Sequence, residues 1–362
     1  MTFLIILLVF SFLIVLLNIG FLIVFPNFTK SKSDKSNYLN ISIIIAFKNE
    51  EKNLGDLFSA LKMLIYPMDK YEVILVDDNS SDNSYQKAVE LSSTNNNYRV
   101  LKAENKKYPG KRGALDVGIR NAKHRYILIT DADCMPGKNW LIGYSEKFNS
   151  GYEMLFGLSP FKQSQGMINK ISCFENLRRS LLTFSFAELK LHYSAAARNF
   201  GFTISAYERL GGFANTLETP SGDDDLLIRE AVKNKLKIGV VDFKESYVLS
   251  ESKSKLKEFL NQKARHTKTS LYYLFIHKFL LGLWHSSNIL MLFSLFLLPI
   301  SFFFIIPFLI KLFGDLIVIL STQKKLNYKF KLNEIPVLQM IYEIFLIVNF
   351  FSSFRKNIAW KN

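Results

Sequence analysis

The sequence predicts an α/β domain built on a parallel sheet, with apolar segments on both sides of it along the chain. Two observations carry this prediction. Between residues 41 and 130, short apolar runs alternate with segments whose apolar residues recur at helical spacing, and this alternation is typical of a parallel sheet covered by helices. The first 25 residues and the chain from about residue 279 onward are much more apolar than the middle.

The first apolar segment predicts a membrane anchor. Residues 2–25 carry no charge, and at about 1.5 Å per residue they can cross a hydrocarbon core of about 30 Å. A signal peptide would show a basic start, a shorter apolar core and a small-residue cleavage site, and none is present. We therefore expect a retained anchor over residues 1–26. Lysines follow it at Lys30, Lys32 and Lys35, so the positive-inside rule places the next domain in the cytoplasm, at the inner membrane face.

The strands of the middle region follow in regular order. Residues 41–47 read ISIIIAF and predict a buried strand, and the apolar residues after it recur at helical spacing. Residues 73–76, 98–102 and 126–130 predict three further strands, with helical patterns between them. Beyond Asp133 the alternation becomes less regular, and we place the whole cytoplasmic domain at residues 30–278.

Carboxylates follow two of these strands. Asp77 and Asp78 come after the second, Asp131 and Asp133 after the fourth, and a third cluster occupies residues 223–225. Carboxylates at the carboxyl ends of neighbouring parallel strands converge on one crevice. They repel one another unless a cation compensates, so the pattern predicts Mg²⁺ or Mn²⁺. Each cluster alone is also good turn or capping chemistry, but the three together favour a site.

Composition narrows the function classes. Lysine and arginine number 46 against 31 acidic residues, a net charge of +15. Nucleic acid or an anionic membrane surface would suit this excess; the apolar ends favour the membrane, and we expect no nucleic-acid partner. Cys134 and Cys173 lack metal or redox spacing, as in a reducing compartment. Neither the dinucleotide-binding nor the P-loop glycine pattern is present, which argues against those two enzyme classes.

The last third of the chain predicts further membrane segments. Residues 279–321 hold two spanning lengths separated by Pro299 and suggest a helical hairpin, although Lys311 and Asp315 lie in its second arm. A charge inside a membrane must face protein or reach the interface.

For two other predicted helices, the position relative to the membrane is left open. Residues 335–354 carry polar residues along one helical face and are followed by basic residues. A transmembrane helix is one alternative, and we favour an interfacial or re-entrant helix. Residues 161–184 suit either an amphipathic helix on the bilayer or an ordinary packed helix.

Six motifs in a fixed order connect residues 40–270 with a known family. They are ISIIIAFKNEE, VDDNSSD, YPGKRGALDVGIRNAKHRYILITDADCMP, AAARNFGFTISAYERLGGF, GDDDLLIRE and QKARH. In this order they resemble the family 2 glycosyltransferases, membrane-associated enzymes of the GT-A fold that use nucleotide-sugars. Two positions depart from the usual pattern: Ala46 stands where proline is common, and His266 where tryptophan is common.

The resemblance implies roles for the acidic residues. Asp133, with Asp131 nearby, would hold the metal that neutralises the departing diphosphate. The third cluster would supply the general base that accepts the proton of the acceptor hydroxyl. Two alignments of the motif differ by one residue, so Asp223 is the first choice and Asp224 the second, and Asp225 is the expected helix N-cap. Arg265 would add cationic stabilisation.

The donor site is expected around the first two clusters. Asp78 would accept a hydrogen bond from the N–H of a uracil-type ring, while Asp77 holds the turn. A lysine can also be ordinary solvated surface, and that alternative stays open for Lys111. The other expected donor-binding residues are taken from the same motifs: Ala46 through its backbone, Glu50, Lys111, Asp131 and Gln262.

The predicted function is an inverting hexosyltransferase of the cell envelope. It would move a sugar from a nucleotide-sugar, with UDP favoured, to a lipid or lipid-linked glycan at the membrane. One alternative is a processive polysaccharide synthase, which the small number of membrane segments disfavours. The other is an inactive scaffold that binds nucleotide-sugar, which the complete acidic set disfavours.

Overall fold

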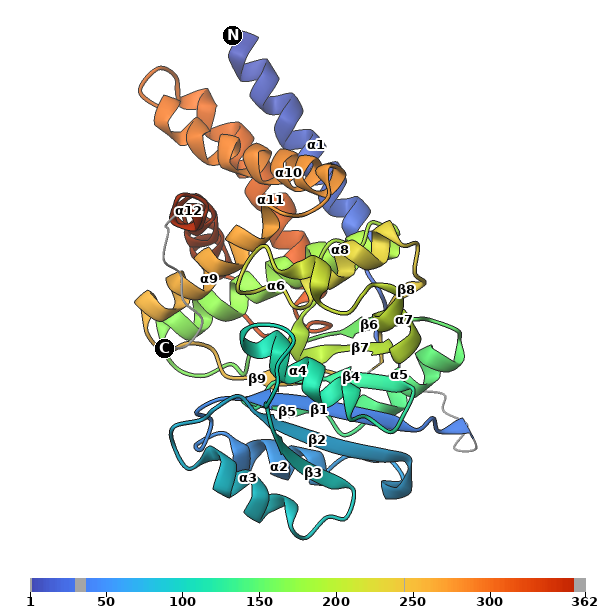
Figure 1. Cartoon of the computed structure of the whole chain (residues 1–362). Helices are drawn as coiled ribbons and strands as arrows, with labels where there is room; N and C mark the ends of the chain where they lie inside the picture. The colour runs from blue at the N-terminus through green and yellow to red at the C-terminus, as the bar shows by residue number, and fades with distance from the viewer. Residues whose placement is uncertain (1, 30–36, 244, 355–362) are drawn as a thin grey trace. The chain divides into compact units, whose positions relative to one another are not determined.

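The computed structural model describes residues 2–29, 37–243 and 245–354 (Figure 1). The predicted lysines at positions 30, 32 and 35, and the basic residues after position 354, lie outside these ranges. The chain forms two compact units. The sheet unit consists of Phe28–Lys162 and His192–Glu251, and the helical unit consists of Met1–Asn27, Gln163–Leu191 and Ser252–Asn362.

The sheet unit contains a seven-stranded sheet of order β3-β2-β1-β4-β7-β6-β8. The first four strands are parallel, as predicted, whereas β7 runs antiparallel to both of its neighbours, β4 and β6. The sheet, with helices between its strands along the chain, confirms the predicted α/β fold class. The strands are β1 Ile41–Phe47, β2 Tyr71–Asp77, β3 Tyr98–Lys102, β4 Tyr126–Ile129, β6 Met154–Gly157, β7 Phe200–Thr203 and β8 Ile238–Val241, and a separate pair joins β5 Cys134–Pro136 to β9 Val248–Ser250.

Burial explains why the first strands form. All seven residues of β1 and all seven of β2 are buried, and continuous apolar runs of this kind are typical of strands covered on both faces. Helices alternate with the strands along the chain and bury their apolar residues. They are α2 Leu54–Lys62, α3 Ser84–Ser92, α4 Gly110–Arg120, α5 Trp140–Asn149, α7 Ile204–Arg209 and α8 Asp225–Lys233, with short 3-10 turns at Met68–Lys70, Ala197–Asn199 and Ala214–Thr216.

Asn199, just before β7, joins several of these elements. Its side-chain oxygen accepts hydrogen bonds from Trp140 Nε1 and the Tyr144 hydroxyl, each at 2.8 Å. Its amide nitrogen donates to the carbonyl oxygens of Leu158 and Ser246 at 2.7 and 3.3 Å. The residue is fully buried, so its hydrogen-bonding capacity is used within the protein.

The helical unit contains four helices that are long and apolar enough to cross a membrane, judged by length and composition. They cover residues 2–24, 275–297, 302–322 and 335–352. The predicted anchor and both arms of the predicted hairpin are thus helices, while the domain boundaries and the crossing of the last helix stay predictions. The helices of this unit are α1 Thr2–Val24, α6 Met167–Glu188, α9 Leu256–Ser270, α10 Phe275–Phe293, α11 Ile305–Thr322 and α12 Ile335–Ser353, with 3-10 turns at Ser294–Leu297 and Phe302–Phe304.

α6 matches the packed-helix alternative for this segment. Most of its residues are buried, and it contacts α1 and α12 within the helical unit. This segment, and the chain as far as residue 278, was expected to belong to the cytoplasmic domain. By contacts, both α6 and α9 group with the apolar helices.

The charges within the apolar helices face protein. Lys311 and Asp315 in α11 are fully buried and pair at 2.8 Å. Lys311 also pairs with Glu343 of α12. Arg178 of α6 contacts Asp315 at 3.2 Å, and Asn18 of α1 donates a hydrogen bond to the same carboxylate at 3.3 Å. Four helices therefore share one buried polar network.

Candidate functional site

Strand register brings the ends of β1 and β2 to one edge. Phe47 lies opposite Asp77, and the backbone N–H of Asp78 donates to the carbonyl oxygen of Phe47 at 2.7 Å. Asp77 accepts from the backbone N–H of Ser80 at 3.2 Å, as a turn residue does. Asp78 forms an ion pair with Lys106 at 2.5 Å.

The segment after β1 lies beside this turn. Ala46 is buried, opposite Val76. Asn49 has a φ of 54°, in the left-handed region that asparagine tolerates. The backbone N–H of Glu50 then donates to Ser84 Oγ at the start of α3, at 2.7 Å. The two segments that carry the predicted donor-binding residues Ala46, Glu50 and Asp78 are thus held together.

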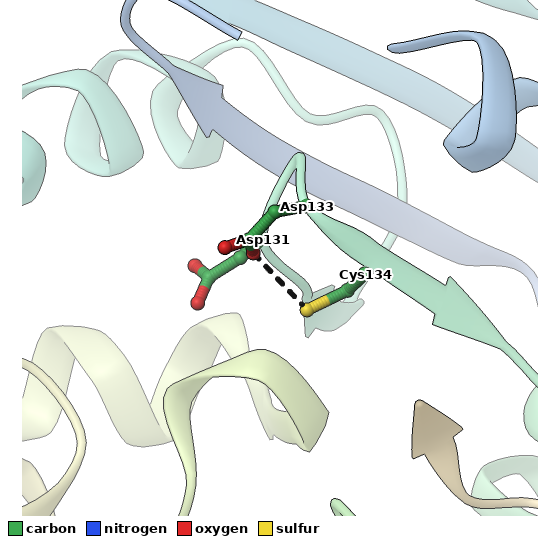
Figure 2. A group of neighbouring side chains, drawn as sticks. All are labelled: Asp131, Asp133 and Cys134. Carbon is green, nitrogen blue, oxygen red and sulfur yellow. Dashed lines mark hydrogen bonds between the residues drawn. The ribbon is translucent and has the colours of Figure 1, made fainter. Parts of the chain in front are cut away.

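The second acidic pair follows β4 at the same edge of the sheet. Ile44 pairs with Ile129, and the N–H of Thr130 donates to the carbonyl oxygen of Ile44. Figure 2 shows Asp131, Asp133 and Cys134 together, with one ligand atom from each within 4.8 Å of the others.

The donor set of this group fits a hard divalent cation. Two carboxylates supply the oxygen ligands that Mg²⁺ and Mn²⁺ prefer. The Cys134 thiol donates to Asp133 Oδ1 at 3.5 Å, and burial, with the nearby carboxylates, raises its pKa well above the usual range. A thiol that stays protonated is not a ligand for such an ion, so Asp131 and Asp133 would hold it.

Lys111 connects the second cluster to the third. Its Nζ lies 2.6 Å from Asp131 Oδ1 and 3.1 Å from Asp223 Oδ2. Burial alone would lower the pKa of Lys111, but the charges of Asp131, Asp223 and Asp224 outweigh it and raise the pKa above its ordinary value. Lys111 is therefore a partly buried cation paired on two sides, rather than the solvated surface lysine of the alternative interpretation.

The three carboxylates of the third cluster have different partners. Asp224, not Asp225, is the N-cap of α8, and its side chain accepts from the backbone N–H of Asp225 at 2.8 Å. The expectation for Asp225 was wrong by one position. Asp225 instead accepts from Ser194 Oγ at 2.7 Å and from the N–H of Ala195 at 3.1 Å. Asp223 pairs with Lys111 as described.

The electrostatics separate Asp223 from Asp224. Burial would raise the pKa of Asp223, but Lys111 and Arg112 outweigh it and hold the pKa below its usual value. Burial, together with the charges of Asp225 and Asp223, raises the pKa of Asp224 to about 7. Near neutral pH, Asp223 is thus ionised while Asp224 carries a proton for much of the time.

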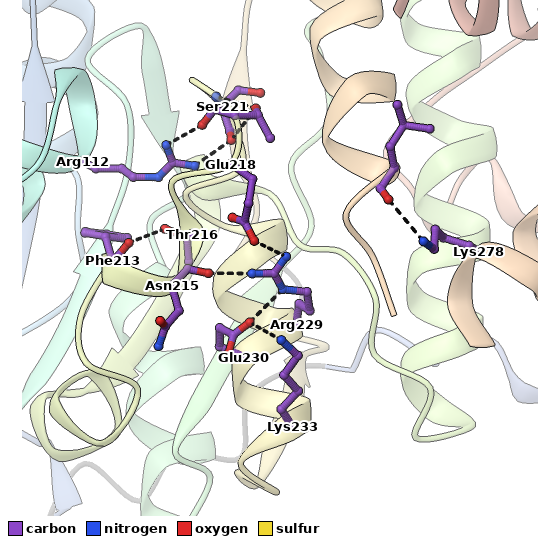
Figure 3. Close-up of polar contacts among 12 residues, drawn as sticks. Arg112, Phe213, Asn215, Thr216, Glu218, Ser221, Arg229, Glu230, Lys233 and Lys278 are labelled. Carbon is purple, nitrogen blue, oxygen red and sulfur yellow. Dashed lines mark hydrogen bonds and ion pairs between the residues drawn. The ribbon is translucent and has the colours of Figure 1, made fainter. Parts of the chain in front are cut away.

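Two arginines, Arg112 and Arg229, hold the loop before this cluster (Figure 3). Arg112 donates to the carbonyl oxygens of Thr219 and Ser221, at 2.8 and 2.7 Å. Arg229 pairs with Glu218 at 2.7 Å. Gly222 then adopts a φ of 89°, which favours glycine. These contacts determine the direction in which the chain enters the acidic cluster.

Lys106 and Arg112 were not among the predicted site residues. Arg112 lies within the motif that contains Lys111, and Lys106 lies two residues before that motif. A cation in a polar segment is most often solvated, and only the fold shows the partners of these two. Gln262, Arg265 and His266 lie in α9 of the helical unit. There, Arg179 of α6 lies 3.4 Å from His266 Nδ1. The roles predicted for Gln262 and Arg265 stay predictions.

The chain is similar in sequence to known glycosyltransferases. Residues 42–206 match the model of Glycosyl transferase family 2. Glycosyltransferase AglE of Haloferax volcanii is 27% identical over 184 residues, covering 49% of this chain and 57% of that protein. Beta-monoglucosyldiacylglycerol synthase of Trichormus variabilis is 34% identical over 102 residues, covering 28% of this chain and 22% of that protein. The chain thus spans well under two thirds of these curated relatives.

A solved structure shows the same fold. It is the mannosyltransferase PcManGT from Pyrobaculum calidifontis in complex with GDP-Man and Mn²⁺, which is 15% identical to this chain. The match covers 95% of this chain and 99% of that one, with a TM-score of 0.53. At this identity the likeness shows the fold alone.

Proposed function

Residues 42–206 belong to the family 2 glycosyltransferases, and from this premise we propose that the chain transfers a sugar from a nucleotide-sugar to an acceptor at a membrane. One observation carries the proposal. Asp131, beside Asp133, and Asp223 converge on Lys111 in the sheet unit. This supports a site in which Asp131 and Asp133 would hold a metal ion beside an ionised carboxylate that can accept a proton.

The metal side of the site consists of Asp131 and Asp133. A bound Mg²⁺ or Mn²⁺ would supply positive charge where the leaving diphosphate becomes more negative. Asp78 is positioned at the end of β2, where one of its oxygens can accept from a base N–H while the other pairs with Lys106. Lys111 would supply a second positive charge for the diphosphate.

Asp223 is the better candidate for the base. A base must be ionised before the reaction, and Asp223 has the lowered pKa whereas Asp224 has the raised one. Both oxygens of Asp224 are also engaged, with the backbone N–H groups of Ala197 and Asp225. Asp223 would accept the proton of the acceptor hydroxyl in a single inverting displacement.

The acceptor class follows from the helical unit. Four candidate spans support placement of the enzyme at a membrane, and one relative is named a glucosyldiacylglycerol synthase. We therefore propose a lipid or lipid-linked glycan as acceptor, and a UDP-sugar as the first donor to test. GDP-mannose is the second donor, because the solved structure of like fold contains it.

A donor screen tests the proposal. Purified full-length protein in detergent is given UDP- or GDP-sugars, Mn²⁺ and extracted membrane lipids, and release of nucleoside diphosphate is measured. Asp133→Asn should abolish metal-dependent release, whereas Asp56→Asn, on the exposed surface of α2, should not. A wild-type protein that binds nucleotide-sugar but never releases diphosphate would indicate the inactive scaffold. Products of increasing length would indicate a polysaccharide synthase.

A labelling experiment tests the location. We propose that the sheet unit lies in the cytoplasm, at the inner face of the membrane. The two native cysteines are buried, so a cysteine introduced at exposed Thr94 gives the dominant signal. An impermeant maleimide should label it in lysed cells only, and labelling in intact cells would reverse the proposed topology.

A further inference from the structure

We propose that Lys111 is an internal counter-ion that occupies Asp131 until a donor diphosphate draws it away, so that metal binding and donor binding are coupled. This inference rests on the proposed function, because it concerns the metal and donor of the same site. It adds a role that neither the metal ligands nor the base provide.

The geometry gives Lys111 two alternative partners within the protein. Its ammonium lies 2.6 Å from Asp131 and 3.1 Å from Asp223, and 15% of its side chain is exposed. It is the second residue of α4, directly after Gly110, whose φ is +59°. The backbone of Lys111 is thus fixed by a helix, while its four-carbon side chain can reorient the charge.

This position sets a monovalent charge against a divalent one. A metal ion on Asp131 and Asp133 would lie close to the Lys111 ammonium, and like charges at short distances repel in a partly buried site. The lysine therefore opposes a metal ion that arrives alone. Asp223 remains as a partner for the ammonium when Asp131 is taken.

A bound diphosphate would offset the repulsion between Lys111 and the metal ion. It brings negative charge to the metal and also offers oxygen acceptors to Lys111, so the ammonium no longer has to compete for Asp131. Metal and nucleotide should then bind better together than separately. Since coupling between two ligands is reciprocal, each should raise the affinity for the other by the same factor.

A purely structural lysine would behave differently. If Lys111 only braces Asp131 against Asp223, its removal leaves two carboxylates less well ordered and should not tighten metal binding while weakening nucleotide binding. Opposite signs for the two ligands are therefore the signature of the counter-ion role.

The experiment is a Mn²⁺ titration of the full chain in detergent, followed by the paramagnetic resonance signal of free Mn²⁺, without nucleotide and with saturating UDP or GDP. For Lys111→Met we expect Mn²⁺ alone to bind on the order of tenfold more tightly than to wild type. With nucleotide present, the gain should disappear, so the coupling factor falls. Lys111→Arg, which keeps the charge, should retain most of the coupling.

Lys106→Met is the matched control. It removes one lysine charge from the same loop and helix region, but its partner is Asp78 rather than Asp131. The affinity for Mn²⁺ without nucleotide should stay close to the wild-type value. Melting temperatures identify any variant that fails to fold, and Lys111→Gln replaces Lys111→Met in that case.

Three outcomes decide the matter. Tighter Mn²⁺ binding with reduced coupling in Lys111→Met supports the inference. Unchanged coupling in a folded Lys111→Met overturns it and leaves the proposed function intact. Failure of wild type to bind Mn²⁺ in either condition overturns the proposed metal site and this inference together.

Discussion

Two lysines hold pairs of carboxylates in opposite ways in the two units of this chain. Lys111, in the sheet unit, contacts Asp131 and Asp223 with side chains that are 15 to 31% exposed. Lys311, in the helical unit, contacts Asp315 and Glu343 where at most 1% of any side chain is exposed. One cluster is open to solvent and the other is sealed.

The charge balance differs as well. Around Lys111 and Arg112 lie four carboxylates, those of Asp131, Asp133, Asp223 and Asp224, so the open cluster has surplus negative charge. In the sealed cluster Lys311 and Arg178 balance Asp315 and Glu343. Surplus charge that solvent can reach suits exchange of ions and ligands, whereas a balanced buried set suits fixed packing, since leaving one member unpaired is costly.

The largest effect is expected in the open cluster, in rate. Asp223→Asn removes the proposed base, and loss of a general base typically lowers a rate by about 10²- to 10⁴-fold. Nucleotide-sugar affinity should stay within a small factor, because Asp223 is not among the donor-binding residues. Initial transfer rates and a nucleotide titration on the same preparation measure both quantities.

Asp224→Asn is the comparison for that variant. The amide keeps one of the two oxygens that accept from backbone N–H groups. With a pKa of about 7, about half of the Asp224 carboxyl groups already carry a proton near pH 7, so most of the transfer activity should survive. Loss of transfer in Asp224→Asn alone would move the base to Asp224. Near-wild-type transfer in both variants would mean that the third cluster does not activate the acceptor.

The next effect is expected in the sealed cluster, in stability. Lys311→Met leaves Asp315 and Glu343 without their shared partner, and breaking a buried ion pair by removing one member typically costs about 3–5 kcal/mol. Chemical unfolding in detergent measures this loss, while a binding assay on protein that remains folded should show unaltered Mn²⁺ affinity. A stability close to wild type would mean that water or lipid headgroups reach the cluster.

A smaller effect is expected from pH. The folded-state pKa of Asp224 is about 7, above its unfolded value of about 4. Between these values the folded protein binds more protons than the unfolded chain, so its stability falls as pH rises. Asp224→Asn should remove this part of the pH dependence, so its loss of stability between pH 5 and pH 8 should be smaller than that of wild type by roughly 1 kcal/mol or more. If the stability of the variant changed between pH 5 and pH 8 as much as that of wild type, the raised pKa of Asp224 would be contradicted.

The smallest effect is expected at an exposed pair of the helical unit. Lys170 contacts Glu334 at 2.7 Å, but its side chain is 43% exposed. Lys170→Met should therefore change stability by less than about 1 kcal/mol. A loss as large as that of Lys311→Met would show that burial is not what separates the two kinds of ion pair.

The first half of the fold could be predicted because its signals are local. Continuous apolar runs predict the four parallel strands, and the carboxylates after β2 and β4 follow from the strand ends. The reversal at β7 could not be predicted in this way. The runs of β6 and β7 are four residues each, and their antiparallel pairing depends on contacts between distant parts of the chain.

The site also has a part that could be predicted from local sequence and a part that could not. Asp131, Asp133 and Asp223 could be named from motifs, whereas the partners of Lys106, Lys111 and Arg112 depend on tertiary packing. The N-cap was misplaced by one residue because three consecutive aspartates offer the same local chemistry. The glycine at position 222 was the available sequence signal. Glycine favours the positive φ that the chain adopts there, directly before the acidic cluster and α8.

The hydrogen bonds of Asn199 have a consequence for how this chain can vary in evolution. A Cβ atom at Gly157 would lie 2.5 Å from Asn199 Nδ2, so a larger residue at 157 is incompatible with asparagine at 199. Substitutions at these two positions are expected to occur together, and a change at 199 would leave Trp140 and Tyr144 without their shared acceptor. Invariance at position 199 would then record the internal architecture of the sheet unit, and a search for catalytic residues by sequence conservation alone would select it in error.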